Sequence, residues 1–494
     1  MNNTHESLRR TISNAYLLTV VGRGADVLFF VGIFTYLSVE EVGLYSWALA
    51  VAAFFSIAID LGFSQTLIRE FSKKSLDMKS AAIGGVAIRI PILVLGLVGL
   101  FIWDNFWKPG DAEYWAVALA GSIQIFVVAE NFCQSWLKAN SLQTVANILA
   151  TIDPLGRLVV FVILMYGLKN IGVHQLLMSI LFLHVFIFSI LIIAVRSAQI
   201  NSLNGNKVSV VSIKVAIKTL SQSSIVFGLI GFITVTQNRL DWLMVSKYGS
   251  NVDLANYSLA NKGYEILMML LGVAMVTVYP WICRQNRSVL FLTKINIITV
   301  SLFISGVILS LGAALYMPLV LEWIWSDKYR DAQPLLQVLL PVAALSTAIM
   351  ILYYQLIARG AEQKVLKIGI ISTVAQVAVN MTLIPRFGAY GAVLGMAILA
   401  CGNLIGYSFL AYTSKVRNAS QLWWNVGFLI WMLIFSIALW ASGAQVILGG
   451  LGLLVAGVVG GYLMLASHRE RIWLKAWVNR VASRHIHLSR RKVT

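Results

Sequence analysis

Long runs of apolar residues, each bounded by polar or turn residues, recur along the whole chain. A helix needs about 20 mostly apolar residues to cross the hydrocarbon core of a bilayer, and most of these runs reach that length. The runs therefore predict about fourteen transmembrane helices. Their approximate bounds are residues 12–37, 42–68, 80–103, 113–138, 143–166, 173–196, 220–246, 254–282, 291–316, 334–358, 363–385, 388–412, 421–442 and 445–467.

The composition excludes a soluble alternative. A chain of 494 residues would otherwise suggest three or four soluble domains of roughly 150 residues each. It is 59% hydrophobic and only 12% charged, whereas a typical soluble protein is about 25% charged. No soluble fold buries so many apolar side chains, so we predict an all-α polytopic membrane protein.

Basic residues alternate between the two sides of the predicted bundle. The connection after 42–68 carries Arg69, Lys73, Lys74 and Lys79, whereas the connection before it carries Glu40 and Glu41. By the positive-inside rule this alternation places both termini in the cytoplasm. The net charge of +18 then faces the anionic inner leaflet, so membrane lipids are the expected partner and nucleic acid is not.

A short internal repeat suggests how the helices are grouped. Residues 39–48 resemble residues 251–260, and both segments open an even-numbered predicted helix. Six helices separate the copies, which predicts two parallel six-helix lobes related by an axis along the membrane normal. We therefore expect an N-terminal lobe with a cytoplasmic linker at 1–219, a second lobe at 220–420, two further transmembrane helices at 421–467, and a basic amphipathic tail at 468–494.

The chain offers no place for a separate catalytic domain. The longest connections before the tail, at about 197–219 and 317–333, are too short to fold alone. Cys133, Cys283 and Cys401 are far apart with no neighbouring ligand motif, so we interpret them as packing residues and expect no metal and no cofactor. Any function must then reside in the helical bundle.

Ionisable residues inside the predicted spans are therefore the candidates for a site, because charge is costly in hydrocarbon. Three pairs have spacings that allow contact on one helix: Arg23 with Asp26, Asp153 with Arg157, and Lys262 with Glu265. Each pair either neutralises a helix for insertion or serves function, and the sequence favours neither reading. Within this set Arg23, Arg157 and Lys262 are candidate contacts for an anionic substrate.

Two further arginines have no partner on their own helix. Arg89 lies in the third predicted span, and Arg239 stands two residues from Asp241, so that those two side chains face different ways. A buried arginine calls for a carboxylate from another helix or an anionic ligand, and its planar fork suits phosphate. Arg89 and Arg239 are the leading candidates for substrate contact.

The acidic candidates point to ion coupling. Glu130 has no cation within reach on its own helix, and Glu130, Asp26, Asp153 and Asp60 are candidates to bind a coupling ion. Salt bridging between helices is the alternative for Asp26 and Asp153. His184, in the middle of its predicted span, is interpreted as a packing residue in preference to a proton relay.

Several short motifs resemble those of a known family. They are Glu41-Val42-Gly43-Leu44-Tyr45, Asp60-Leu61-Gly62, Arg69-Glu70, Asn238-Arg239-Leu240-Asp241, Tyr257, Pro280, Gly360-Ala361-Glu362-Gln363, Asn380, Leu383-Ile384-Pro385, Phe387-Gly388 and Gly391-Ala392. In this order they resemble the polysaccharide transporter branch of the multidrug/oligosaccharidyl-lipid/polysaccharide exporter superfamily. The resemblance covers nearly the whole chain.

The resemblance implies a Wzx-type flippase of the bacterial inner membrane. Its implied substrate is an undecaprenyl-pyrophosphate-linked oligosaccharide, the repeat unit of O-antigen or capsule, with a polysaccharide polymerase and a chain-length regulator as further partners. An ion-coupled drug or metabolite antiporter of the same superfamily is the nearest alternative. A membrane-embedded polysaccharide polymerase is a third, although its catalytic residues need a larger outer loop than this chain offers.

Overall fold

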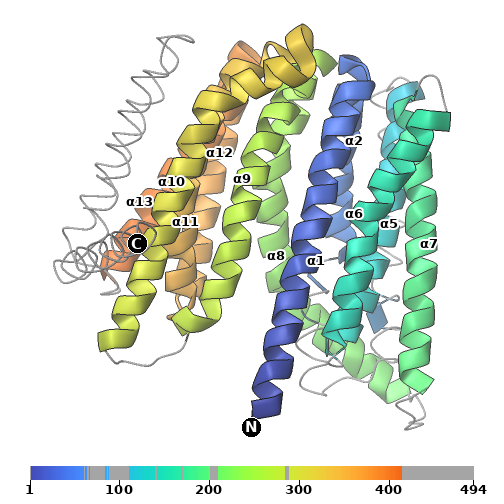
Figure 1. Ribbon diagram of the computed structural model, residues 1–494, viewed down its shortest axis with the longest axis vertical. Helices are drawn as coiled ribbons and strands as arrows, with labels where there is room; N and C mark the ends of the chain where they lie inside the picture. The colour runs from blue at the N-terminus through green and yellow to red at the C-terminus, as the bar shows by residue number, and fades with distance from the viewer. Residues whose placement is uncertain are drawn as a thin grey trace, which may run out of the picture. The chain divides into compact units, whose positions relative to one another are not determined.

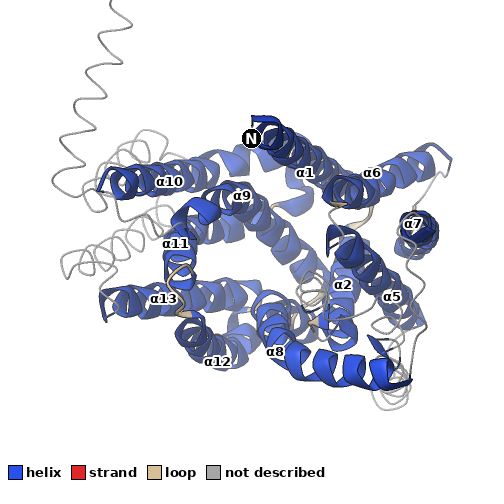
Figure 2. Ribbon diagram, turned by 90° about the horizontal axis from the view of Figure 1, so that it is seen from below, coloured by secondary structure: helices blue, strands red, loops and turns tan. Residues whose placement is uncertain are grey.

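The computed structural model describes residues 2–60, 62–63, 66, 84–85, 87, 111–139, 142–167, 171–200, 210–283 and 289–413. Every regular element within these ranges is a helix (Figures 1 and 2). The predicted all-α class is therefore confirmed. The predicted spans 80–103, 421–442 and 445–467, and the tail at 468–494, lie outside the described residues.

The chain divides into two compact units. The first runs to Ser258 and also takes in Asn380–Ala389. Its helices are α1 (Asn2–Tyr36), α2 (Val39–Asp60), α5 (Asp111–Ala139), α6 (Gln143–Gly167), α7 (Val173–Ile200), α8 (Val210–Tyr248) and the first turns of α9 (Asn251–Cys283). In this unit α1 packs along α6, while α5 packs against both α2 and α7 (Figure 2).

The second unit contains Leu259–Val379 and the chain from Tyr390 onwards. It is built from the rest of α9, α10 (Val289–Trp325), the short 3-10 helix η1 (Ser326–Tyr329), α11 (Ala332–Ile357), most of α12 (Glu362–Phe387) and α13 (Ala389–Thr413). Among the described helices that are long and apolar enough to cross a membrane, α11 is the most enclosed, because 78% of its most apolar stretch is buried. The core of this unit therefore forms around α11.

The helices agree with the predicted spans wherever both can be compared. Each predicted span other than the three outside the described residues overlaps one helix, although most of the last part of the span 42–68, after Asp60, also lies outside those residues. Eight of the described helices are long and apolar enough to cross a membrane, or nine if a bent pair in α10 is one span. Neither α8, which carries Arg239 and Asp241, nor α9, which carries Lys262 and Glu265, is among the eight.

Helix ends differ from the predicted connections. Residues 317–333 were expected to be a loop, but α10 continues to Trp325 and η1 follows directly. The helix axis bends by 49° between the segments Ser305–Met317 and Leu319–Tyr329. Helices α7 and α8 likewise extend into the expected 197–219 connection, since polar residues end a membrane span without ending a helix.

The internal repeat is visible as a repeated structure. Ser38 caps α2: its backbone N–H and hydroxyl both donate to Glu41, and its hydroxyl accepts from the Glu41 backbone. Ser250 and Asp253 make the same three hydrogen bonds at the start of α9. Both are capping boxes, in which an acidic side chain reaches back to the N-cap. The repeat thus reproduces local structure as well as sequence.

The two copies also meet each other. The Ser46 hydroxyl donates to the Ser258 hydroxyl at 3.0 Å, and both serines are buried. These are equivalent positions of the repeat, 212 residues apart. Contact between equivalent residues is the arrangement that a twofold relation between the two copies produces.

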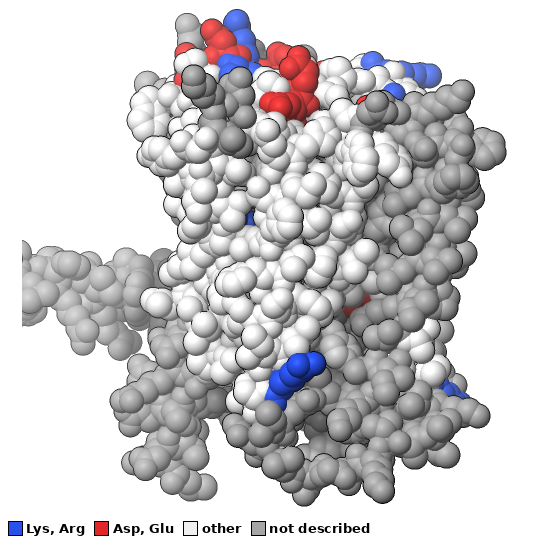
Figure 3. Space-filling model, turned by 90° about the vertical axis from the view of Figure 1, so that its right-hand side faces the viewer, with Lys and Arg blue, Asp and Glu red and all other residues white. Residues whose placement is uncertain are grey.

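Charge is distributed unevenly over the face of the molecule in Figure 3. Acidic side chains gather at one end, together with some Lys and Arg, whereas the charged atoms drawn at the opposite end are basic. Between the two ends, the described atoms in this view are almost all uncharged. Such a zone is what a helical bundle presents to the hydrocarbon core of a membrane.

Candidate functional site

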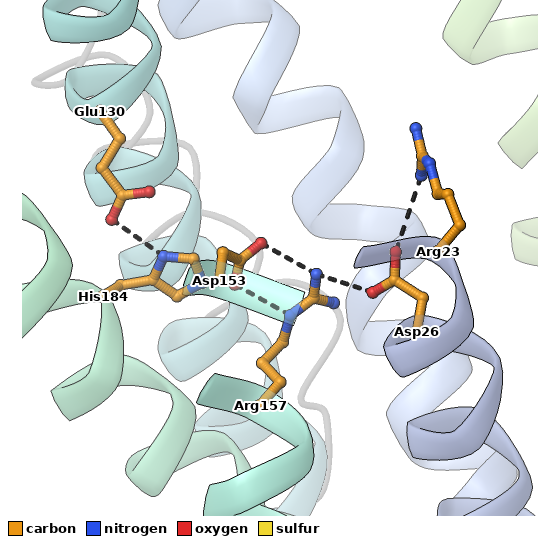
Figure 4. Close-up of polar contacts among 6 residues, drawn as sticks. All are labelled: Arg23, Asp26, Glu130, Asp153, Arg157 and His184. Carbon is orange, nitrogen blue, oxygen red and sulfur yellow. Dashed lines mark hydrogen bonds and ion pairs between the residues drawn. The ribbon is translucent and has the colours of Figure 1, made fainter. Parts of the chain in front are cut away.

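A network of charged side chains lies inside the first unit (Figure 4). At its centre the Arg157 guanidinium makes two hydrogen bonds of 2.9 Å to Asp153, one turn earlier on α6. The same guanidinium lies 3.1 Å from Asp26 on α1. Arg157 therefore joins two helices through two carboxylates, an arrangement that offsets the cost of placing its charge among apolar helices.

One end of the network is deeply buried. The His184 ring on α7 lies 3.0 Å through Nδ1 from Glu130 on α5, and 3.6 Å through Nε2 from Asp153. His184 is 3% exposed and Glu130 is 4% exposed. Glu130, which has no cation within reach on its own helix, thus finds its partner on a neighbouring one.

The other end of the network is open. Arg23 lies 3.6 Å from Asp26 on the same helix, and its side chain is 53% exposed. The side chains of Asp26 and Arg157 are much less exposed, at 14% and 22%. The six residues therefore connect an accessible guanidinium on α1 with an enclosed imidazole on α7.

Close helix packing brings these residues together. A Cβ at Gly32 on α1 would lie 2.4 Å from the Phe161 ring on α6, and one at Gly22 would lie 3.2 Å from Pro154. Asp26 lies between these two glycines on α1. Small residues permit such close approach between membrane helices. The same holds for α6 and α7, where a Cβ at Gly156 would lie 2.7 Å from Leu183.

A second polar cluster lies near the end of α8. The Asp241 carboxylate is 1% exposed and accepts hydrogen bonds from the Tyr257 hydroxyl and from the Trp242 backbone N–H at 2.9 Å. The Arg239 guanidinium stacks over the Trp242 ring at 4.4 Å. Tyr257 belongs to the repeat on α9, so this cluster ties the end of α8 to the contact between the two copies.

The remaining candidates lie elsewhere. Lys262 and Glu265 pair at 2.5 Å in the second unit. Asp60 is the last residue of α2 and is half-buried. Arg89 lies outside the described residues. Within the described ranges, no group of three or more His, Cys, Asp or Glu could hold a metal ion.

All three predicted same-helix pairs form. The sequence did not predict the links between helices, which depend on packing between α1, α5, α6 and α7. His184 is buried and satisfied by a hydrogen bond, as expected of a packing histidine, but both of its ring nitrogens also face carboxylates, which the sequence did not predict. A histidine in mid-span with an unpaired glutamate on a nearby helix was the available signal.

Solved structures of transporters share this fold. The lipid II flippase MurJ, in an inward closed conformation, matches with a TM-score of 0.66 at 13% identity, over 94% of this chain and 99% of MurJ. The MATE multidrug transporter DinF-BH, in a ligand complex, matches with a TM-score of 0.58 at 14% identity, over 83% and 95% of the two chains. A MOP superfamily transporter from Pyrococcus furiosus matches with a TM-score of 0.52 at 13% identity, over 87% and 96%. No curated protein matches the chain by sequence.

The helices, the fold and the internal charge network define a multi-pass membrane protein with the fold of the MOP superfamily transporters. Residues 8–286 match the model of the polysaccharide biosynthesis protein family. This match covers more than half of the chain, and the chain belongs to that family. The expected resemblance is therefore confirmed as membership of a polysaccharide biosynthesis family and as the fold of the MOP superfamily transporters.

Proposed function

We propose that the protein is a flippase that moves an undecaprenyl-pyrophosphate-linked oligosaccharide, an O-antigen or capsule repeat unit, across the bacterial inner membrane. Membership of a polysaccharide biosynthesis family and the fold of a lipid II flippase support this proposal. The observation that carries it is an arginine, Arg23, exposed at one end of a charge network within apolar helices. Both termini lie in the cytoplasm, in accord with the distribution of basic residues.

Arg23 is the substrate contact that the geometry favours. Its guanidinium is half-exposed and its carboxylate partner is 3.6 Å away, so it can turn towards an anion without abandoning a buried carboxylate. A guanidinium binds pyrophosphate through paired, charge-assisted hydrogen bonds. Arg157 and Lys262 are held closely by carboxylates, and in this proposal they position their neighbours. Arg89 and Arg239 are the further proposed contacts.

Translocation follows from alternating access, in which the binding site opens to one side of the membrane at a time. The lipid chain stays in the bilayer while the charged head group and sugars cross through the protein. Ion coupling supplies the driving force, and Glu130, Asp26, Asp153 and Asp60 are the acidic residues proposed to take part.

Ligand-induced stabilisation tests the proposed substrate class. Purified protein is heated in detergent with undecaprenyl-pyrophosphate oligosaccharide, with undecaprenol, or with a cationic rhodamine dye. A ligand at about 100 times its Kd stabilises the folded state by about 2.7 kcal/mol. We expect stabilisation by the lipid-linked oligosaccharide alone, and a weaker effect in Arg23→Gln. Stabilisation by the dye and not by the oligosaccharide would reject the proposal.

A drug or metabolite antiporter is the second candidate. The structural likeness to DinF-BH and the buried acids Glu130 and Asp241 favour it, because acidic sites suit cationic substrates. In that case the dye would stabilise the protein, and Arg23→Gln would leave dye binding unchanged.

A further inference from the structure

His184 occupies an unusual position between two carboxylates from two different helices. Nδ1 lies 3.0 Å from Glu130 on α5, and Nε2 lies 3.6 Å from Asp153 on α6 (Figure 4). A neutral imidazole has only one N–H, so it can satisfy only one of these contacts as a donor. The position of the ring between the two carboxylates therefore limits which protonation states of His184 and Glu130 are favourable.

The possible proton arrangements can be compared directly. With its proton on Nδ1, a neutral ring donates to Glu130 but turns the Nε2 lone pair towards the Asp153 carboxylate. With its proton on Nε2, it turns the Nδ1 lone pair towards Glu130, which is favourable only if Glu130 is itself protonated. Every contact becomes favourable when the Glu130–His184 pair holds one additional proton, either as an imidazolium or as a protonated glutamate.

Charged and titratable side chains on four helices surround the Glu130–His184 pair. From α6, Asp153 and Arg157 face it, and Arg157 donates two hydrogen bonds to Asp153. From its own helix α5, Cys133 lies near Glu130, and from α2 the Tyr45 hydroxyl lies within electrostatic reach of Arg157. Beyond Arg157 lies Asp26 on α1. Without the additional proton, the Glu130 carboxylate would be buried beside a neutral His184 ring. A buried charge without a counter-charge is costly among membrane helices, and the additional proton removes that cost.

We propose that the Glu130–His184 pair is a proton-binding site, and that proton binding there favours the binding of an anion at Arg23. The proton draws Asp153 towards His184, so Arg157 is shared more with Asp26, and Arg23 becomes free for the anion. Loss of the proton reverses these preferences. The second part rests on the proposed function, because it assigns the anion to Arg23, whereas the first part rests on the geometry alone.

The proton itself can be observed without any substrate. A variant keeps His184 and replaces the five other histidines, His5, His174, His468, His485 and His487, by glutamine. Its ¹⁵N-labelled ring is followed by NMR from acidic to alkaline pH. We expect Nε2 to carry a proton at acidic pH and to lose it as the pH rises. A ring that carries its proton on Nδ1 alone at every pH would overturn the proposal.

The coupling is measured by the pH dependence of anion binding, with farnesyl pyrophosphate as the probe. Coupling is reciprocal, so one proton strengthens binding by up to about tenfold per unit of falling pH. We expect the affinity for the probe to change more steeply with pH in the wild type than in His184→Gln or Glu130→Gln. His174→Gln should show the same pH dependence as the wild type. His174 is the matched control because it lies on the same helix and its ring pairs with the Ala112 backbone carbonyl oxygen, at 2.9 Å, in place of a carboxylate.

The two measurements separate the possible failures. If the wild type does not bind the probe at any pH, the proposed function fails while the NMR experiment still tests the proton site. If the probe binds with the same pH dependence in the wild type and in His184→Gln, the coupling is wrong. If His184→Gln does not fold, the comparison rests on Glu130→Gln, which keeps the volume of the side chain and removes its charge.

Discussion

Substituting Gly43 by alanine should separate the two copies of the repeat. A Cβ at this position of α2 would lie 2.0 Å from the backbone oxygen of Asn251 and 2.9 Å from its Cα. Ordinary contact begins at 3.4 Å, so the first turn of α9 must move by about 1.4 Å. The obstacle is backbone, so rotation of a side chain cannot relieve it.

The energetic cost can be estimated from this movement. Overpacking of this kind costs about 1–3 kcal/mol. The Ser46–Ser258 hydrogen bond, now 3.0 Å, would stretch beyond bonding range, with a further loss of about 0.6 kcal/mol for a hydrogen bond between membrane helices. Alanine regains about 1 kcal/mol in helix propensity. These contributions from overpacking, the lost hydrogen bond and helix propensity sum to a net destabilisation of about 0.6–2.6 kcal/mol.

Thermal unfolding in detergent, followed by tryptophan fluorescence, measures this effect. Gly24→Ala on α1 is the matched control, because a Cβ there would meet nothing within 4 Å. It should be neutral or slightly stabilising. If Gly43→Ala proves as stable as Gly24→Ala, the close approach of α2 and α9 is wrong.

Three further predictions follow from the network and the repeat. Arg157→Met should destabilise the protein by about 3–5 kcal/mol in thermal unfolding, because the Asp26 and Asp153 carboxylates lose their shared partner. Adding Asp153→Asn should recover part of this loss. Equal stability of the single variant and the wild type would refute this prediction. Tyr257→Phe should cost about 1–3 kcal/mol in the same assay, since the buried Asp241 loses a donor, and an unchanged unfolding temperature would count against that hydrogen bond. With Cys133, Cys283 and Cys401 replaced by alanine, a Ser46→Cys and Ser258→Cys pair should form a disulfide under mild oxidation, because the two hydroxyls lie 3.0 Å apart. Failure to cross-link in the folded protein would contradict the contact between the two copies.

The fold could be predicted from the sequence to a large extent because a membrane imposes a simple rule. Every backbone polar group must be satisfied within the hydrocarbon, so a long apolar run becomes a helix, and its length marks the span. Helix ends were predicted less well, because a helix continues past the apolar region, as α10 does up to Trp325. The capping boxes at Ser38 and Ser250 were visible in the sequence as Ser followed three residues later by an acid.

The candidate site could be predicted only in part. Pairs within a helix follow from its period, so Asp153 and Arg157 could be matched from spacing alone. The partners of Glu130 and the second carboxylate of Arg157 depend on which helices pack together, and glycines such as Gly32 and Gly156 decide how closely. That information lies in three dimensions, and for this reason His184 was assigned to packing.

The central claim, that the protein flips a lipid-linked oligosaccharide, is tested most directly by translocation in proteoliposomes. A fluorescent undecaprenyl-pyrophosphate oligosaccharide is incorporated with the protein, and its exposure is followed with a membrane-impermeant quencher, beside vesicles loaded with the cationic rhodamine dye. The account predicts protein-dependent movement of the oligosaccharide, weakened in Arg23→Gln, and no transport of the dye. Transport of the dye by a folded protein that leaves the oligosaccharide on its original side would contradict the account.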